Sequence, residues 1–151
     1  MSQTIIRLAR ADEYDEVARI WMESWASAGI EAASDSLLAK LRTRVPKEVE
    51  RGWSLYVADD NGALAAMLAL HLSDCYLDQL FVAPEYQGNG VGRQLLGFTR
   101  QLLPDEIWLR CVRENEKAWR WYEREGFVFE KEQLEPMRGF TMKYYRWRKS
   151  A

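Results

Sequence analysis

The residues best suited to chemistry follow an apolar run that ends at Val82. The segment after this run consists of Gln87, Gly88, Asn89, Gly90, Val91 and Gly92, with Arg93 directly after it and then leucines at helical spacing. Glycine allows backbone conformations that a side chain would forbid, and it lets amide N–H groups approach an anion closely. The first turn of a helix adds unpaired N–H donors at the positive end of its dipole. The segment therefore predicts a phosphate-binding loop between a strand and a helix, where Arg93 could meet a phosphate oxygen.

Two common phosphate-binding motifs do not fit this loop. A P-loop requires Lys-Ser or Lys-Thr after its last glycine, and no glycine of this chain is followed by either pair. The dinucleotide fingerprint G-x-G-x-x-G would need glycine at the position of Arg93. A glycine turn that starts a helix without binding any ligand remains an alternative.

A second group of residues shares the spacing i, i+3, i+4 and i+7, and its members are Asn115, Ala118, Trp119 and Tyr122. This spacing places them on one face of a helix. A tyrosine, with an ordinary pKa of about 10, can return a proton to a thiolate whose conjugate acid has a pKa of about 8.5. A single buried tyrosine is, however, more often structural.

The two motifs together resemble the GNAT superfamily of acetyl-CoA-dependent N-acetyltransferases. Gln87, Gly90 and Gly92 match the family's Q/R-x-x-G-x-G/A signature, and the segment 115–122 matches N-x-x-A-x-x-x-Y without a gap. The resemblance covers nearly the whole chain and is most specific between residues 77 and 127. It implies that the loop 87–92 holds the pyrophosphate of CoA.

The resemblance also implies roles for five further residues. Asn115 would hydrogen-bond the pantetheine amide, Ala118 would leave room for it, and Tyr122 would direct its hydroxyl at the CoA sulfur as a general acid. The backbone of Leu80 and Val82 would pair with the pantetheine arm where the central strand splays from the next one. The Leu80 N–H is the candidate oxyanion donor.

Asp78 is a charged residue inside an apolar strand, two positions before Leu80. Strand alternation places Asp78 and Leu80 on one face. A buried carboxylate is costly unless it is paired, which makes Asp78 a candidate for the general base. A salt bridge or a loop-capping role is the alternative reading, and Tyr76 is the other candidate base of the same parity.

The acceptor is expected to enter opposite the pyrophosphate side. The entrance would lie between the Trp21–Trp25 end of the first helix, the segment 29–38 and the strand that carries Tyr76 and Asp78. Asp78 could attract an alkylammonium and relay its proton, and Trp21 or Trp25 could supply a cation–π contact. If Asp78 is structural, the remaining candidate bases are Tyr76, Glu23 and Glu31.

Periodicity and turn signals predict the elements that position these residues. Strands are expected at 4–10, 53–59, 63–72, 75–82, 107–112, 127–129 and 140–147. Helices are expected at 14–25, after a cap at Ser34 or Asp35, between Pro46 and Gly52, at 92–103 and at 115–125. The fold class is α/β of the α+β type: a mixed, mainly antiparallel sheet of six or seven strands with flanking helices. The resemblance adds a V-shaped strand splay, and the working boundary is a single domain, 1–151.

The amino-acid composition argues against some classes of binding partner. The 151 residues suit one domain, and the net charge of −2 argues against nucleic acid as the main partner. One histidine and two cysteines give poor support for a metal site, and Cys75 and Cys111 suit buried free thiols of a reducing cytosol. We expect a cytoplasmic protein without a membrane span.

The predicted function is transfer of an acetyl group from acetyl-CoA, without a metal, to a primary amine of a small molecule or peptide. The amine would attack directly in a ternary complex. Two alternatives are a non-catalytic CoA-binding or sensor module and an interaction protein. Tyr144, Tyr145 and Trp147 could form the edge of a homodimer.

Overall fold

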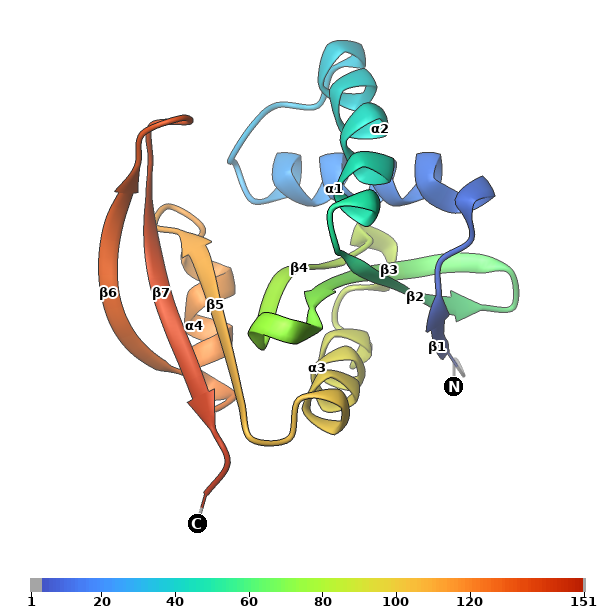
Figure 1. Ribbon diagram of the computed structural model, residues 1–151. Coiled ribbons are helices and arrows are strands. Elements are labelled where there is room, and N and C mark those ends of the chain that lie inside the picture. Colours follow the sequence, from blue (N-terminus) through green and yellow to red (C-terminus); the bar gives the residue numbers. More distant parts are fainter. Residues whose placement is uncertain (1–3, 151) are drawn as a thin grey trace.

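The structure, a computed structural model, describes residues 4–150, so residues 1–3 and Ala151 of the predicted domain lie outside it (Figure 1). Its strands are β1 (Ile5–Leu8), β2 (Ser54–Asp60), β3 (Ala63–His71), β4 (Tyr76–Val82), β5 (Glu106–Val112), β6 (Val128–Glu135) and β7 (Phe140–Arg148). Its α-helices are α1 (Tyr14–Ser27), α2 (Asp35–Glu50), α3 (Val91–Leu102) and α4 (Glu116–Arg124).

The strands form one sheet in the order β1-β2-β3-β4-β5-β7-β6. Every neighbouring pair is antiparallel except β4 and β5, which confirms the predicted mixed, mainly antiparallel sheet. Within residues 4–150, β4 and β5 pair at a single position, Tyr76 with Trp108. Beyond this position the two strands diverge, as Figure 1 shows, and the predicted V-shaped splay is confirmed.

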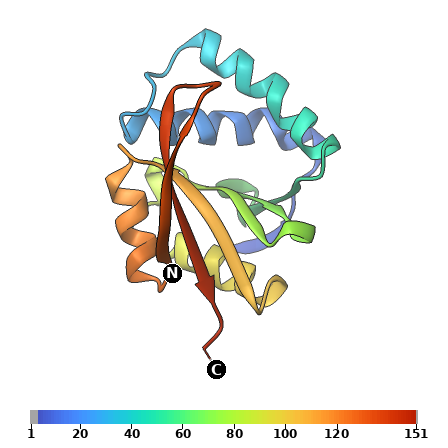
Figure 2. The ribbon, with the colours of Figure 1, turned by 60° about the vertical axis from the view of Figure 1, so that its left-hand side comes forward.

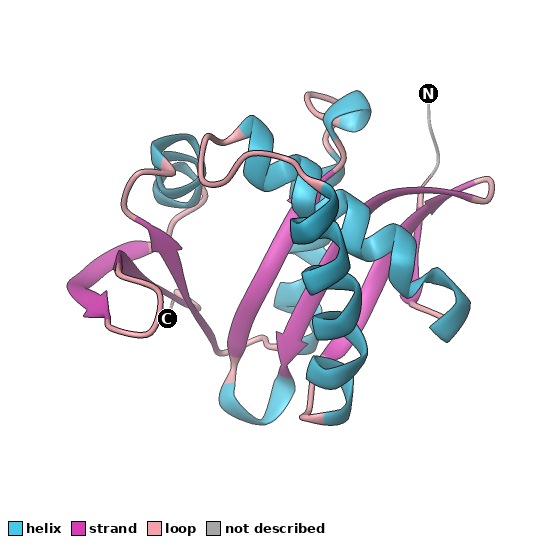
Figure 3. Ribbon diagram, turned by 90° about the horizontal axis from the view of Figure 1, so that it is seen from above, coloured by secondary structure: helices cyan, strands magenta, loops and turns pink. Residues whose placement is uncertain are grey.

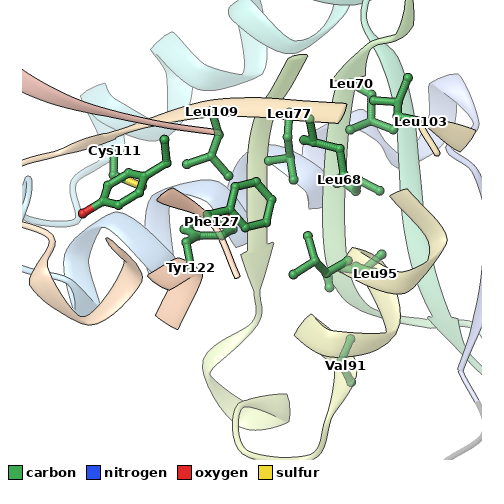
Figure 4. Close-up of a cluster of buried hydrophobic side chains, with 14 of the residues drawn as sticks. Leu68, Leu70, Leu77, Val91, Leu95, Leu103, Leu109, Cys111, Tyr122 and Phe127 are labelled. Atoms are coloured by element: carbon green, nitrogen blue, oxygen red, sulfur yellow. The ribbon is translucent and has the colours of Figure 1, made fainter. Parts of the chain in front are cut away.

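Helices cover both faces of the sheet. Helices α1 and α2 lie on one face, and α3 lies on the other (Figures 1 and 3). One buried cluster joins Leu68 of β3 to Leu95 of α3 and Tyr122 of α4 (Figure 4). The other joins Trp21 of α1 and Leu41 of α2 to the opposite face. The sheet therefore carries apolar side chains on both faces, which anchors β4 from two sides.

The helix α2 is one element where the sequence predicts two short helices. Ser34 caps it, because the Leu37 N–H donates to the Ser34 Oγ at 3.1 Å. Pro46 lies inside the helix and does not begin a new one. Its missing N–H removes one backbone hydrogen bond, while Val45 continues the buried stripe and keeps the helix packed against α1.

The strand β6 runs over Val128–Glu135, so the prediction that it ends at residue 129 is wrong. Seven of its eight residues are exposed and only Glu135 is half-buried, so the strand shows no alternation of buried and exposed positions. Its pairing with β7 holds it in place. The connection between the two strands, expected at 130–139, is therefore only a short turn that contains Pro136 and Gly139. The hairpin reaches up beside the loop that joins α1 and α2 (Figure 2).

The strand β7 is not an edge strand, because it lies between β5 and β6. Tyr145 of β7 is fully buried and donates its hydroxyl to Glu123 Oε2 at 2.7 Å. The expectation that the aromatic residues of this strand form an exposed dimer edge is therefore wrong. The edge at this end of the sheet is β6.

The turn before β4 also differs from prediction. A 3₁₀ turn spans Leu72–Asp74, and Cys75 follows it with φ of 54°, so Cys75 is not part of the strand. Cys75 is half-buried, whereas Cys111 of β5 is buried as expected, and both thiols are free. Burial raises the pKa of the Cys111 thiol to about 12.

Candidate active site

Two cavities open where β4 and β5 diverge. The first, of about 440 Å³, lies between the loop 87–93 and α4, and we call it the glycine-loop cavity. The second, of about 360 Å³, lies among α1, α2, β4, β5 and the β6–β7 turn, and we call it the hairpin cavity. Both cavities are lined by Leu80, Phe81, Asn115, Ala118 and Tyr122. Ligands in the two cavities can therefore meet at these shared walls, and both volumes suit small ligands.

The backbone of the glycine loop requires glycine at two positions. Gly88 and Gly90 have φ of 86° and 81°, values that other residues adopt only with strain. Gly92 has no positive φ, and a Cβ there would make an ordinary van der Waals contact with the Trp121 ring at 3.5 Å. Val91 begins the twelve-residue helix α3, whose unpaired N–H groups lie beside the glycine-loop cavity. The loop thus joins β4 to α3, as its sequence predicts, and it places unpaired N–H groups beside the cavity.

The side chains of the loop take different positions. The Gln87 amide turns back and donates to the carbonyl oxygen of Val82 at 3.1 Å. Arg93 lines the cavity with a side chain that is 75% exposed, and its Nε lies 3.3 Å from Glu125 Oε2. Asn89 is exposed in the same loop and is not among the residues that line the cavity.

The backbone of β4 presents polar groups to the splay. The Ala83 N–H donates to the Ala65 carbonyl of β3 at 2.8 Å. Because backbone groups alternate in direction along a strand, those of Leu80 and Val82 point away from β3 and toward the gap beside β5. Gln87 donates to the Val82 carbonyl, which leaves the two N–H groups and the Leu80 carbonyl directed into the splay. Leu80 lines both cavities, and Val82 lines the glycine-loop cavity.

A bulge in β4 changes the predicted position of Asp78. Leu77 and Gln79 pair with consecutive residues of β3, which leaves Asp78 without a partner in the register. The extra residue breaks the alternation, so Leu77 and Leu80 both pack against the cluster that contains α3. The Asp78 side chain instead contacts Trp53 of the other cluster, so the expectation that it shares a face with Leu80 is wrong, although both residues line the hairpin cavity.

The Asp78 carboxylate is 14% exposed and is surrounded by donors. Its Oδ2 accepts from the indole N–H of Trp53 at 2.7 Å and lies 3.2 Å from His71 Nε2. Its Oδ1 accepts from the Gln79 amide at 3.1 Å and from the Tyr76 hydroxyl at 3.4 Å. These contacts hold the carboxylate in one orientation at the wall of the cavity.

Tyr76 lies in an aromatic stack beside Asp78. Its ring packs on His71 and Trp108, with centroid distances of 5.7 and 4.0 Å. Arg110 Nε donates to the Tyr76 hydroxyl at 3.2 Å. Burial, followed by the nearby charge of Asp78, raises the pKa of Tyr76 well above its ordinary value. Tyr76 is therefore a neutral phenol near neutral pH.

Residues of the second predicted motif, at the start of and within α4, line the walls that the two cavities share. Asn115 is the N-cap of α4, but its side chain does not bond the helix's own N–H groups. Tyr122 is 6% exposed, and burial, with a smaller contribution from Cys111, raises its pKa well above the ordinary value. Trp119 points elsewhere, because its indole donates to the Arg113 carbonyl at 2.9 Å. Thus Asn115, Ala118 and Tyr122 converge, as their spacing predicts.

Comparison with known proteins agrees with this geometry. A family model described as the acetyltransferase (GNAT) family matches residues 14–127. The chain belongs to the GNAT family. The peptidyl-lysine N-acetyltransferase YjaB of Escherichia coli strain K12 is 31% identical over 126 residues, which cover 81% of this chain and 80% of YjaB. This GNAT protein is therefore an N-acetyltransferase, and its acceptor is an amine.

Two solved structures show the same fold. The solution structure of apo YjaB from Escherichia coli has a TM-score of 0.80 and 22% identity, and the match covers 98% of this chain and 99% of YjaB. The PaiA N-acetyltransferase of Thermoplasma acidophilum, in complex with coenzyme A, has a TM-score of 0.75 and 18% identity, and the match covers 97% of this chain and 99% of PaiA.

The two tryptophans predicted to bind the acceptor in this GNAT domain are placed differently. Trp25 lines the hairpin cavity. Trp21 is fully buried behind it, with ring centroids 5.8 Å apart in an edge-to-face arrangement. Tyr76 and Asp78 line the same cavity as Trp25, so three of the four predicted acceptor residues come together.

Several residues at this GNAT site are not predicted by the sequence patterns. Trp53 and His71 contact Asp78, and Arg44, Arg110 and Arg138 line the hairpin cavity. They come from separate elements and form no local motif, although the isolated histidine was a weak signal. Within residues 4–150 there is no cluster of three His, Cys, Asp or Glu residues able to hold a metal ion. No helix in this range has the length and hydropathy to cross a membrane.

Proposed function

We propose that this GNAT protein transfers the acetyl group of acetyl-CoA to a primary amine that enters the hairpin cavity. The observation that carries the proposal is the wall shared by the two cavities. It contains Leu80 and Tyr122, so a donor in one cavity and an acceptor in the other would meet at both residues. Simultaneous binding from two sides supports direct attack in a ternary complex.

The glycine-loop cavity fits CoA. The loop amides and the N-terminus of α3 would bind the pyrophosphate, and Arg93 would add a cation at its edge. Asn115 has an uncommitted side chain for the pantetheine amide, and Ala118 leaves space beside it. The CoA complex of the structurally similar PaiA enzyme supports this choice of ligand. Acetyl-CoA would supply an acetyl group already activated as a thioester.

Leu80 and Tyr122 would serve the reacting atoms at the junction. The Leu80 N–H, directed into the splay, would donate to the carbonyl oxygen as it gains negative charge. Tyr122 remains protonated across the working pH range because burial raises its pKa. The same environment raises the pKa of the Cys111 thiol to about 12, so a CoA thiolate there would also become more basic and could accept the Tyr122 proton.

Asp78 would accept the amine proton, directly or through a water. An alkylammonium has a pKa of about 10.4, so the acceptor arrives mostly charged at neutral pH and must lose a proton before attack. Tyr76 is less suitable because its raised pKa keeps it neutral. Glu23 already pairs with Arg19 on α1. Cys111 lines the hairpin cavity but its pKa of about 12 disfavours a covalent acetyl-cysteine route.

The test is a turnover screen that follows release of free CoA thiol from acetyl-CoA against a panel of primary amines. At least one amine should give saturable turnover, and the product should carry a new acetyl amide by mass spectrometry. CoA binding with no amine-dependent thiol release across the panel would favour the non-catalytic binding module instead.

A further inference from the structure

The hairpin cavity has an unusual balance of charges. Three guanidinium groups line it: Arg44 from α2, Arg110 from β5 and Arg138 from the β6–β7 turn. Two carboxylates, Asp78 and Glu135, line it as well. The formal charges of these five groups sum to +1. Whether a ligand meets free positive charge depends on how far each group is already bonded to the protein.

Both carboxylates are already engaged with donors of the protein. Asp78 accepts from Trp53, Gln79 and Tyr76, and His71 lies beside it. The Glu135 carboxylate accepts the backbone N–H groups of the turn that follows it, at 3.1 and 3.0 Å. Neither carboxylate is within 4.0 Å of one of the three guanidinium groups. The carboxylates are therefore bonded to other donors and form no direct ion pair with the three arginines, and the charge of Asp78 only partly offsets the lowering of the pKa of Arg44.

Two of the arginines lie close together, and nearby carboxylates only weakly compensate their positive charges. Arg44 lies over the Trp21 ring at 4.9 Å, and Arg138 lies over the adjacent Trp25 ring at 6.0 Å. Arg44 approaches Glu48 at 3.6 Å, and no carboxylate within residues 4–150 forms an ion pair with Arg138. Burial, followed by the positive charge of Arg138, lowers the pKa of Arg44. Two like charges held near each other at a cavity wall form a ready site for an anion.

We propose that the acceptor amine carries an anionic group, a carboxylate or a phosphonate, that binds between Arg44 and Arg138. This inference rests on the proposed function, because it identifies the substrate class of the same site. The indole rings of Trp21 and Trp25 support the two guanidinium groups, and the α1–α2 loop and the hairpin tip lie side by side in Figures 1 and 2. Asp78, on β4 in the same cavity, would receive the ammonium end. A polyamine would place a second cation against the arginines and would bind poorly.

The experiment compares matched acceptors with the same amine end. γ-Aminobutyrate, its neutral amide, aminopropylphosphonate and putrescine are assayed by CoA thiol release, together with a series of ω-amino acids of other chain lengths. The best anionic acceptor should have a kcat/KM at least about tenfold above its amide and its diamine. The ratio of the carboxylate to the phosphonate identifies which anion the site prefers. A neutral or dicationic acceptor that equals the anionic one at every chain length would overturn the inference.

Variants locate the anion site. Arg44→Gln and Arg138→Gln should raise the KM of the anionic acceptor about tenfold or more and leave that of the amide nearly unchanged. Arg42→Gln, on the same helix and 52% exposed, should change neither and serves as the matched control. Arg138 lies in an exposed turn, so its variant tests the site even if Arg44→Gln does not fold. Equal KM changes for both acceptors would contradict the assignment.

Failure of the proposed function gives a different pattern. In that case no acceptor releases thiol, although CoA still raises the melting temperature. The anion site is then tested by calorimetry of CoA-loaded protein with N-acetyl-γ-aminobutyrate and with the corresponding amide. Tighter binding of the carboxylate, lost in Arg138→Gln, would support the anion site without catalysis, and equal binding would reject it.

Discussion

Trp53 donates its indole N–H to Asp78 Oδ2 across 2.7 Å. Trp53 precedes β2 and Asp78 lies in the bulge of β4, so the contact reaches over β3, which lies between those strands. Trp53 is 4% exposed, and its burial fixes the donor. The candidate base is therefore oriented on one oxygen by a core residue, while Tyr76 and Gln79 of the cavity wall donate to its other oxygen.

Replacing Asp78 should weaken catalysis and leave CoA binding intact. Asp78→Asn keeps the size of the side chain but removes its ability to accept a proton. Turnover at pH 7 should fall about 10²-fold or more and should recover in part toward pH 9, because more of the amine is then unprotonated. Asp74→Asn, an exposed carboxylate in the preceding turn, is the control. Parent-like rates for Asp78→Asn from pH 6 to 9 would make Asp78 structural.

Tyr122→Phe tests the general acid. The change removes one hydroxyl from the wall shared by the two cavities, so CoA affinity should persist while kcat falls about 10²- to 10⁴-fold. Tyr145→Phe is a matched control, since Tyr145 is also buried and lies outside both cavities. That variant should lose about 1–2 kcal/mol of stability with its bond to Glu123, yet keep its kcat. Unchanged kcat in Tyr122→Phe would assign protonation of the thiolate to water.

Binding of CoA should depend on the conformation of Gly90. CoA at 100 times its dissociation constant should stabilise the fold by about 2.7 kcal/mol, visible as a rise in melting temperature. Gly90→Val should abolish the rise because the backbone at φ of 81° strains a branched residue, although open space surrounds the position. Gly97→Ala, inside α3 and also in open space, should keep the rise and add about 0.5–1 kcal/mol. No rise for the parent protein with millimolar CoA would contradict the cofactor assignment.

The ion pair between Arg7 and Glu13 should control stability in acid. Arg7 donates to both Glu13 oxygens at 2.9 and 2.7 Å, and these bonds lower the pKa of Glu13 from about 4.5 to about 2. Because the folded-state pKa is lowered, the stabilisation is complete above about pH 4.5 and is lost as pH falls toward 2. Glu13→Gln should lower the free energy of unfolding by about 2 kcal/mol at pH 7, with a smaller difference at pH 3.

Urea unfolding at a series of pH values measures this effect. Asp12→Asn is the control, since the Asp12 side chain is 76% exposed in the same turn. A constant difference between Glu13→Gln and the parent from pH 7 to 3 would show that the ion pair does not cause the acid dependence.

The sequence by itself determined the features that arise within one segment. Gly88 and Gly90 mark the loop because their positive φ angles are a local property of the chain. Asn115 and Tyr122 reach the shared cavity walls because helical periodicity fixes their common face. The element order and the strand splay followed from the same local signals together with the family resemblance. Local conformation depends on neighbouring residues, so the printed sequence is enough to indicate it.

Only the tertiary structure decided where Asp78 points and what surrounds it. The bulge arises from the register between β3 and β4, and strict alternation along β4 gives the wrong face. The exposed strand β6 is stabilised by pairing with β7 and therefore has no apolar pattern to reveal it. Arg44 and Arg138 come from a helix and a hairpin turn that meet only after the chain folds. Such contacts depend on how distant segments pack. Packing energy comes from many residues that have no regular spacing along the sequence, so no sequence pattern predicts these contacts.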